Sequence, residues 1–216
     1  MLIDFIEKID IQLFYVINQA GRNAFFDVFM PIMSDVTLFY IPMGLALAFL
    51  LIRNNAKFRV VAVFVLLVIS SSENLSSAVL KPIFARPRPY HSVSEVHLYD
   101  RMGKTWSVTP PLAKVVRGES HSLPSSHATN IFAGAFFLSF FFRKLAPFFY
   151  LIAFLVGYSR VYLGVHFPFD VVAGAVAGTS CGMVYAWPAQ SLIAFFRRKF
   201  AEKGSGPKLE SGGGQG

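Results

Sequence analysis

The chain has 216 residues, of which 54% are hydrophobic and 15% charged, and its mean hydropathy is +0.52. Soluble domains average about 25% charged residues, so this composition argues against a soluble domain and favours a membrane protein of one domain. The net charge of +8 does not indicate nucleic-acid binding, because the basic residues lie at the ends of apolar runs, where membrane proteins carry interfacial charges.

The first residues predict an amphipathic helix. Apolar side chains recur at helical spacing over 2–18, and the charged residues Asp4, Glu7, Lys8 and Asp10 fall mostly between them. This pattern is typical of a helix that lies on the membrane or on a helical bundle.

Five apolar stretches follow, at about 37–52, 60–80, 127–142, 146–163 and 168–187. Several of them approach the ~20 residues that cross a ~30 Å hydrocarbon core. They predict an all-α integral membrane bundle of about five transmembrane helices. Gly174 and Gly178, four residues apart in the last stretch, indicate a face of small residues for close helix packing. We expect 1–203 to form this domain and the Gly- and Ser-rich 204–216 to be a disordered tail or a cloning scar.

Glu73 lies near the middle of the second stretch. A carboxyl group at that depth must face the bundle interior and find partners, or stay protonated. We expect a structural hydrogen bond between helices rather than a catalytic role.

The charges around the stretches predict the orientation. Basic clusters at 53–59, 143–144 and 197–199 fall on one side of the membrane, which the positive-inside rule marks as cytoplasmic. The polar loop 90–123 falls on the outer side, although it carries basic residues of its own. A loop of this length between spans is usually functional or disordered.

The segment 159–170 concentrates chemically active side chains between the last two stretches. Asp170 can orient one nitrogen of His166 and leave the lone pair of the other nitrogen free to attack. Arg160 presents a fork of donors suited to phosphate or carboxylate. Taken alone, the segment also fits a polar helix connection capped by Pro168.

Two further polar clusters are expected on the same outward face. Lys81 and Arg88 lie seven residues apart, and Ser125 and Ser126 provide a helix start before His127. Free backbone N–H groups at such a start attract an anion. The three clusters therefore suggest one phosphate site flanked by two histidines, a nucleophile and a general acid. Individually, the cations also fit interfacial anchors, and His127 fits a polar helix end.

Together these residues resemble the type 2 phosphatidic acid phosphatase family, whose motifs are Lys-x6-Arg-Pro, Pro-Ser-Gly-His and Ser-Arg-x5-His-x3-Asp. The first motif matches 81–89, and the third matches 159–170 without a gap. The second matches 124–127, except that Ser126 stands where the family usually has Gly. The resemblance covers about 57–190.

The resemblance implies metal-independent hydrolysis of a phosphate ester through a phosphohistidine. His166 would attack phosphorus, Asp170 would orient it, and His127 would protonate the leaving oxygen and then activate water. The remaining residues would hold the phosphate oxygens: Lys81, Arg88, Arg160, Ser125 and Ser126. No His, Cys or Asp cluster has metal-ligand spacing, which agrees with a metal-free mechanism, and no cofactor is expected. The family's soluble vanadate-dependent haloperoxidases fit poorly, because five apolar spans leave little material for a soluble bundle.

The leading hypothesis is a lipid phosphatase of a bacterial-type inner (plasma) membrane, with its active site on the extracytoplasmic side. Candidate substrates are phospholipids (phosphatidic acid, phosphatidylglycerophosphate), a polyprenyl pyrophosphate and lipid A. The 1-phosphate of lipid A is slightly preferred, because the long loop could accommodate a saccharide head and its basic residues favour an anion. The alternatives are a phosphotransferase that uses the same phosphohistidine and a non-catalytic lipid-binding or transport protein.

Overall fold

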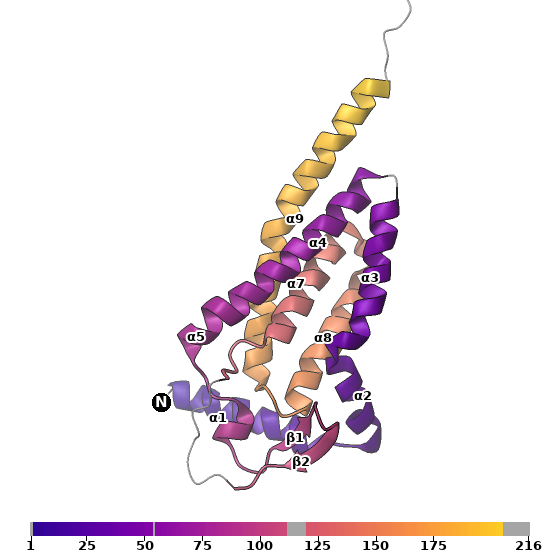
Figure 1. Cartoon of the computed structure of the whole chain (residues 1–216). Coiled ribbons are helices and arrows are strands. Elements are labelled where there is room, and N and C mark those ends of the chain that lie inside the picture. Colours follow the sequence, from indigo (N-terminus) through magenta and orange to yellow (C-terminus); the bar gives the residue numbers. More distant parts are fainter. Residues whose placement is uncertain (1, 54, 112–119, 205–216) are drawn as a thin grey trace, which may run out of the picture.

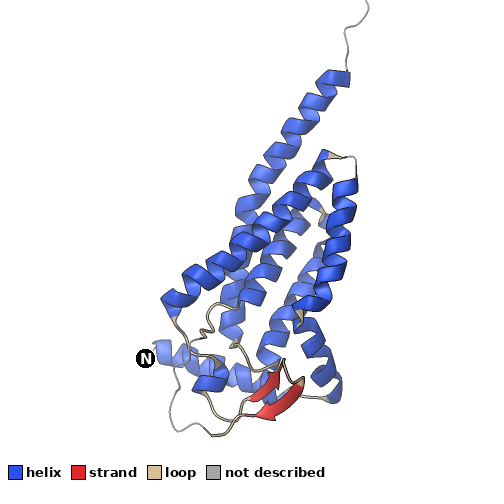
Figure 2. Ribbon diagram, viewed as in Figure 1, coloured by secondary structure: helices blue, strands red, loops and turns tan. Residues whose placement is uncertain are grey.

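The computed structural model describes residues 2–53, 55–111 and 120–204, and this part of the chain forms a bundle of long helices with one small β-hairpin at its end (Figures 1 and 2). The longer helices are α1 (Leu2–Tyr15), α2 (Ala24–Ser34), α3 (Val36–Ile52), α4 (Ala56–Asn74), α7 (Ser126–Phe141), α8 (Ala146–Tyr162) and α9 (Pro168–Gly204). The shorter elements are η1 (Val16–Ala20), η2 (Leu75–Leu80), α5 (Lys81–Phe84), α6 (Pro89–Ser92), η3 (Arg143–Leu145) and the strands β1 (His97–Asp100) and β2 (Thr105–Val108). Of the expected tail at 204–216, Gly204 is the last residue of α9, and 205–216 lie outside the described residues.

The predicted all-α membrane bundle is confirmed, and each of the five apolar stretches is a helix. Within the described residues, three helical stretches are long and apolar enough to cross a membrane: Ala56–Phe84, Arg143–Tyr162 and Pro168–Phe200. Helices α2 and α3, bent by 53° at their junction, make a fourth span if they are taken together. Helix α7 has only 16 residues. Helix α9 continues past the expected end at 187 to Gly204, with Pro188 inside it.

Helix α7 packs most extensively against α9, and glycines make this close approach possible. A Cβ atom on Gly174 would lie 2.7 Å from the carbonyl oxygen of Ser125, and one on Gly178 would overlap the carbonyl of Thr129. The expected small-residue face is therefore present. It holds the start of α7 against the start of α9, where the backbone N–H of Ser125 donates to the carbonyl of Asp170 at 2.9 Å.

We expect Gly178→Ala to destabilise the protein, because its Cβ has no room against the α7 backbone. Overpacking of this kind costs about 1–3 kcal/mol, which lowers Tm by several degrees in a chain of this length. The matched control is Gly134→Ala, because a Cβ at Gly134 meets no atom within 4 Å. Thermal unfolding of the detergent-solubilised variants measures both effects. Equal Tm values would show that α7 and α9 do not depend on this contact.

Helix α1 lies across the end of the bundle that carries the hairpin (Figure 1). Its apolar Phe5, Ile6 and Leu13 are exposed, whereas Asp10 and Phe14 are buried. The helix is amphipathic as predicted, but the face against the protein carries a carboxylate. The exposed apolar residues suit contact with lipid.

The loop 90–123 contains an antiparallel hairpin that the sequence did not predict, in which His97 pairs with Val108 and Asp100 with Thr105. Asn18 in η1 attaches it to the bundle. The Asn18 side chain donates to the carbonyls of His97 (2.8 Å) and Tyr162 (2.9 Å) and accepts from the backbone N–H of His97 (2.9 Å).

The three basic clusters gather at the opposite end of the bundle from the hairpin (Figure 1). Lys57 donates to the carbonyl of Phe141 at 2.8 Å, which links the start of α4 to the end of α7. Arg59 and Arg197 line one cavity between α4 and α9. The bundle therefore has a basic end and an end that carries the hairpin and α1.

Candidate active site

A cavity of about 530 Å³ opens between α3, α4, α7 and α8, at the part of the bundle nearer the hairpin. Six of the eight predicted site residues line it: Lys81, Arg88, Ser126, His127, Arg160 and His166. Residues from three segments far apart in the sequence thus meet around one space. Asp170 lies behind His166, and Ser125 is buried beside α9.

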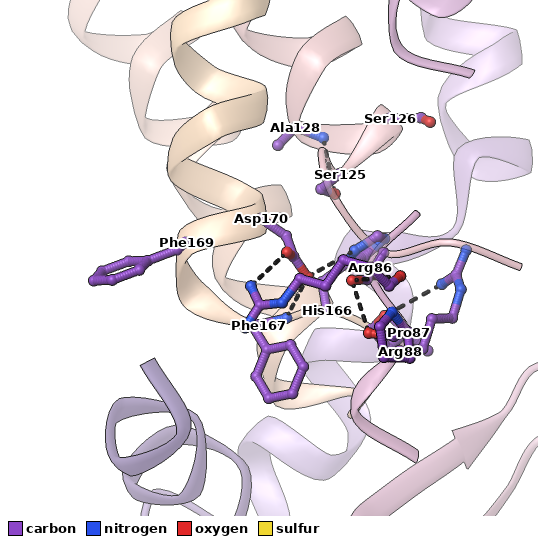
Figure 3. Close-up of polar contacts among 12 residues, drawn as sticks. Arg86, Pro87, Arg88, Ser125, Ser126, Ala128, His166, Phe167, Phe169 and Asp170 are labelled. Carbon is purple, nitrogen blue, oxygen red and sulfur yellow. Dashed lines mark hydrogen bonds and ion pairs between the residues drawn. The ribbon is translucent and has the colours of Figure 1, made fainter. Parts of the chain in front are cut away.

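His166 sits in the connection between α8 and α9, with 2% of its surface exposed. Its Nδ1 faces Oδ2 of Asp170 at 3.6 Å, so Nε2 is the nitrogen left to face the cavity. The same Oδ2 accepts the backbone N–H of Phe167 at 2.8 Å, which fixes the carboxylate (Figure 3). Burial lowers the pKa of His166 to about 4, although Asp170 opposes this shift. At neutral pH the imidazole is therefore uncharged, and a nitrogen lone pair is available for attack.

The start of α7 places His127 on the cavity wall. Ser125 is the N-cap, and its Oγ accepts the backbone N–H of Ala128 at 3.5 Å. Ser126 lines the cavity, and its Oγ lies 3.0 Å from Oγ of Ser76. Nε2 of His127 is buried and has no hydrogen-bond partner among the described residues. Ser125 therefore shapes the helix start, and its hydroxyl does not reach the cavity.

Three cations face this space, and none of them pairs with a carboxylate within the described part of the chain. Arg88 donates to Oγ of Ser120 (2.7 Å) and to the carbonyl of Val165 (3.2 Å). Arg160 donates to Oγ of Ser34 through Nη1. Lys81 lines the cavity from the start of α5. Positive charge that makes no ion pair with a described carboxylate suits an anionic ligand.

Glu73 also lines the cavity, where its Oε2 accepts from Nδ2 of Asn130 at 2.5 Å. Asn130 in turn accepts from Oγ of Ser72 at 2.8 Å. Glu73 therefore makes a hydrogen bond between α4 and α7, as its position near the middle of an apolar stretch suggested. Asn130 was not predicted from the sequence.

The remaining wall of the cavity is apolar: Met33, Val36, Phe39, Tyr40, Met43, Ile69, Ile131 and Val156. Most of these side chains come from α3 and the end of α2. The cavity thus has a cationic end with two histidines and a long hydrophobic side, an arrangement that fits a molecule with a phosphate head and apolar chains.

A smaller cavity of about 310 Å³ adjoins the first, and Arg160 lines both. Its other charged residues are Arg101 and Lys104 from the hairpin turn and Asp35, whose Oδ1 lies 2.6 Å from Arg101. Of the loop cations expected to favour an anion, these two lie beside the site, whereas Lys114 and Arg117 fall outside the described residues.

Arg86 is a residue that the sequence analysis missed. Its Nη1 lies 2.8 Å from Oδ1 of Asp170 (Figure 3), and its Nη2 lies 2.8 Å from Oδ2 of Asp10. It stands two residues before Arg88 in an Arg-Pro-Arg-Pro run, so its position in the sequence was a signal. Its partner Asp10 gave no signal, because a charged residue in an amphipathic pattern is expected to face solvent.

No three His, Cys, Asp or Glu side chains of the described residues lie together in a way that could hold a metal ion. The described part of the chain brings together two imidazoles, one of them beside a carboxylate, and three cations. Such a set can transfer a phosphoryl group by covalent catalysis with general acid assistance.

Comparison with known proteins gives the same picture. The profile of the PAP2 superfamily matches residues 59–192, a range that holds all eight predicted site residues and leaves out Asp10. The lipid A 4'-phosphatase of Bacteroides thetaiotaomicron is 30% identical over 97% of this chain and 89% of that protein.

Two solved structures are similar. Aquifex aeolicus LpxE is 29% identical, with a TM-score of 0.57 over 81% of this chain and 93% of that one. A transmembrane PAP2 type phosphatidylglycerolphosphate phosphatase from Bacillus subtilis is 23% identical, with a TM-score of 0.55 over 92% and 87% of the two chains. At this identity the second likeness concerns the fold alone.

Proposed function

The chain belongs to the PAP2 superfamily and is a membrane lipid phosphatase, and from this premise we propose that it hydrolyses its substrate through a phosphohistidine on His166, without a metal ion. The observation that carries the proposal is the single cavity that joins two histidines, three cations without carboxylate partners among the described residues, and a hydrophobic wall. A binding or transport protein has no need of the paired histidines.

In the first step, Nε2 of His166 forms a bond to phosphorus as the ester P–O bond breaks. His127 donates a proton to the leaving oxygen, which departs as the lipid alcohol. A phosphate dianion bound among Lys81, Arg88 and Arg160 offsets their charge. The three cations stabilise the equatorial oxygens of the transition state.

In the second step, His127 takes a proton from water, and the water oxygen bonds to phosphorus as the P–N bond breaks. Phosphate leaves, His166 is again neutral, and His127 has recovered its proton. Asp170, whose Oδ2 lies 3.6 Å from Nδ1 of His166, would orient the imidazole through both steps, so that the same nitrogen faces the substrate. Backbone N–H groups at the start of α7, next to Ser126, support the phosphate oxygens.

We place the active site on the extracytoplasmic side of the plasma membrane. The support is the basic end of the bundle, which the positive-inside rule assigns to the cytoplasm. The cavity lies toward the other end, where α1, with its exposed apolar residues, can rest on the outer membrane surface.

Lipid A is the substrate that we propose first. The lipid A 4'-phosphatase of B. thetaiotaomicron supports this choice, because the similarity extends over nearly the whole of both chains. Arg101 and Lys104 beside the site suit a headgroup with further negative charge. The name of this relative makes the 4'-phosphate, rather than the 1-phosphate preferred from the sequence, the first ester to test.

The test is phosphate release by the detergent-solubilised protein from a panel of lipid A, phosphatidic acid, phosphatidylglycerophosphate and a polyprenyl pyrophosphate, with EDTA present. We expect release to be fastest from lipid A and unaffected by EDTA. Vanadate should compete with the substrate, because it resembles the transferred phosphoryl group. Activity that is lost in EDTA and returns with magnesium would contradict the histidine mechanism.

A further inference from the structure

We propose that Asp10 in α1 and Arg86 are positioning residues for the nucleophile, joined to Asp170 in a carboxylate–guanidinium–carboxylate chain that ends at His166 and whose two carboxylates are buried. The inference rests on the proposed function, because it takes His166 as the nucleophile. It assigns a positioning role to the N-terminal helix, which lies outside the matched range 59–192.

Arg86 is held at both ends of its guanidinium. Nη1 lies 2.8 Å from Asp170 and Nη2 lies 2.8 Å from Asp10, while the guanidinium carbon sits 4.1 Å from the ring centroid of Phe167. A planar fork fixed by two carboxylates and an aromatic face has little freedom to rotate. Its direction toward Asp170 is therefore fixed by Asp10.

The two oxygens of Asp170 have different partners. Oδ1 pairs with Arg86, and Oδ2 faces Nδ1 of His166 and accepts from the backbone of Phe167 (Figure 3). Because Arg86 holds Oδ1, the carboxylate cannot turn without losing an ion pair in a buried place. The orientation of the His166 ring depends on this arrangement.

Asp10 is 1% exposed, although it belongs to a helix whose apolar Phe5 and Leu13 are exposed. Its Oδ1 accepts the backbone N–H of Phe169 at 2.9 Å, one residue before Asp170. A buried carboxylate is costly unless it is paired. Asp10 pairs with Arg86 and accepts from the backbone one residue before Asp170, so it holds both the guanidinium that contacts Asp170 and the start of α9.

The chain also affects the charge that His166 experiences. The groups facing His166 are Asp170 from α9, Arg160 from α8, Arg88 at the start of α6, His127 from α7 and Lys81 from α5. Asp170 raises the pKa of His166, whereas burial and the cations lower it. Without Arg86, the charge of Asp170 is less compensated and the pKa of His166 rises. Without the charge of Asp10, Arg86 compensates Asp170 more fully and that pKa does not rise.

The experiment compares full-length Arg86→Gln, Arg86→Lys and Asp10→Asn in detergent. We expect Arg86→Gln to lower kcat by about 10- to 100-fold with little change in KM, as for other residues that orient an active-site group. The acid limb of its pH–rate profile should move toward neutral pH. Arg86→Lys should return the acid limb to its wild-type pH, because the positive charge is kept. It should not restore kcat, because one ammonium cannot bridge both carboxylates. Asp10→Asn should lower kcat without moving the limb upward.

The control variant is Arg22→Gln, which breaks an exposed ion pair with Asp27. It should change neither kcat nor the pH of the acid limb. NMR titration measures the pKa of the His166 imidazole directly, without substrate turnover. The His166 signal is assigned by its absence from the spectrum of His166→Ala. Unchanged titration in Arg86→Gln, with activity lost only in proportion to folded protein, would make the chain a structural anchor and overturn the inference. Wild-type protein that cleaves no lipid phosphate would instead contradict the proposed function, while the NMR result would still decide the inference.

Discussion

His166→Ala is expected to abolish phosphate release from every substrate, whatever its leaving group, because no phosphoenzyme can form without the attacking nitrogen. Loss of a nucleophile that acts together with other catalytic groups costs up to roughly 10⁶-fold in kcat. The measurement is single-turnover phosphate release from lipid A and from an activated aryl phosphate. The side chain is 2% exposed, so thermal unfolding must be measured alongside to confirm that the variant folds.

The matched control for this variant is His91→Ala. His91 packs beside Tyr90 at 4.4 Å between ring centroids and lies outside the cavity lining, so its loss should leave activity unchanged. A folded His166→Ala protein that keeps a substantial part of the activity with either substrate would remove His166 from the nucleophile's role.

His127→Ala should have an effect that depends on the leaving group. General acid assistance is worth about 10²–10⁴-fold, and a lipid alcohol needs it more than an aryl oxide, which is a stable anion. We expect a large loss of kcat with a lipid monoester and a partial rescue with an aryl phosphate. The rescue is incomplete, because His127 also activates water in the second step.

The ratio of the two losses is the quantity to measure. It should be far from one for His127→Ala and close to one for Lys81→Ala, because Lys81 holds phosphate oxygens that both substrates share. Equal losses with the two substrates in His127→Ala would show that this residue does not protonate the leaving group.

Much of this site could be predicted from local sequence. Lys81, Arg88, His127, Arg160 and His166 all lie at or near the ends of apolar stretches, and helix ends on one membrane face must come together when the stretches pack. The glycine face of α9 could also be predicted from local sequence, because residues four apart lie on one side of a helix. Predictions of this kind are possible where a regular pattern, such as an apolar stretch or a helical spacing, extends over many residues.

The rest depended on contacts that no local pattern encodes. Asp10 meets the start of α9 across 159 residues of sequence, through its hydrogen bond with Phe169. The periodicity of α1 assigned its charged side chains to solvent, but Asp10 is buried against Arg86.

The hairpin was not predicted either, because each of its strands has four residues, too few for an alternating pattern to be distinct. Ser125 was correctly predicted to cap α7, but only the packed structure shows that its hydroxyl is used by the cap.

The most direct test of the central claim is to trap labelled phosphate on the protein. Wild type, His127→Ala and His166→Ala are mixed with a labelled activated substrate and quenched in alkali, which preserves a phosphorus–nitrogen bond. We predict that His127→Ala accumulates label on His166, because it forms the phosphoenzyme and hydrolyses it slowly, and that His166→Ala carries none. Label on the His166→Ala protein would contradict the assignment.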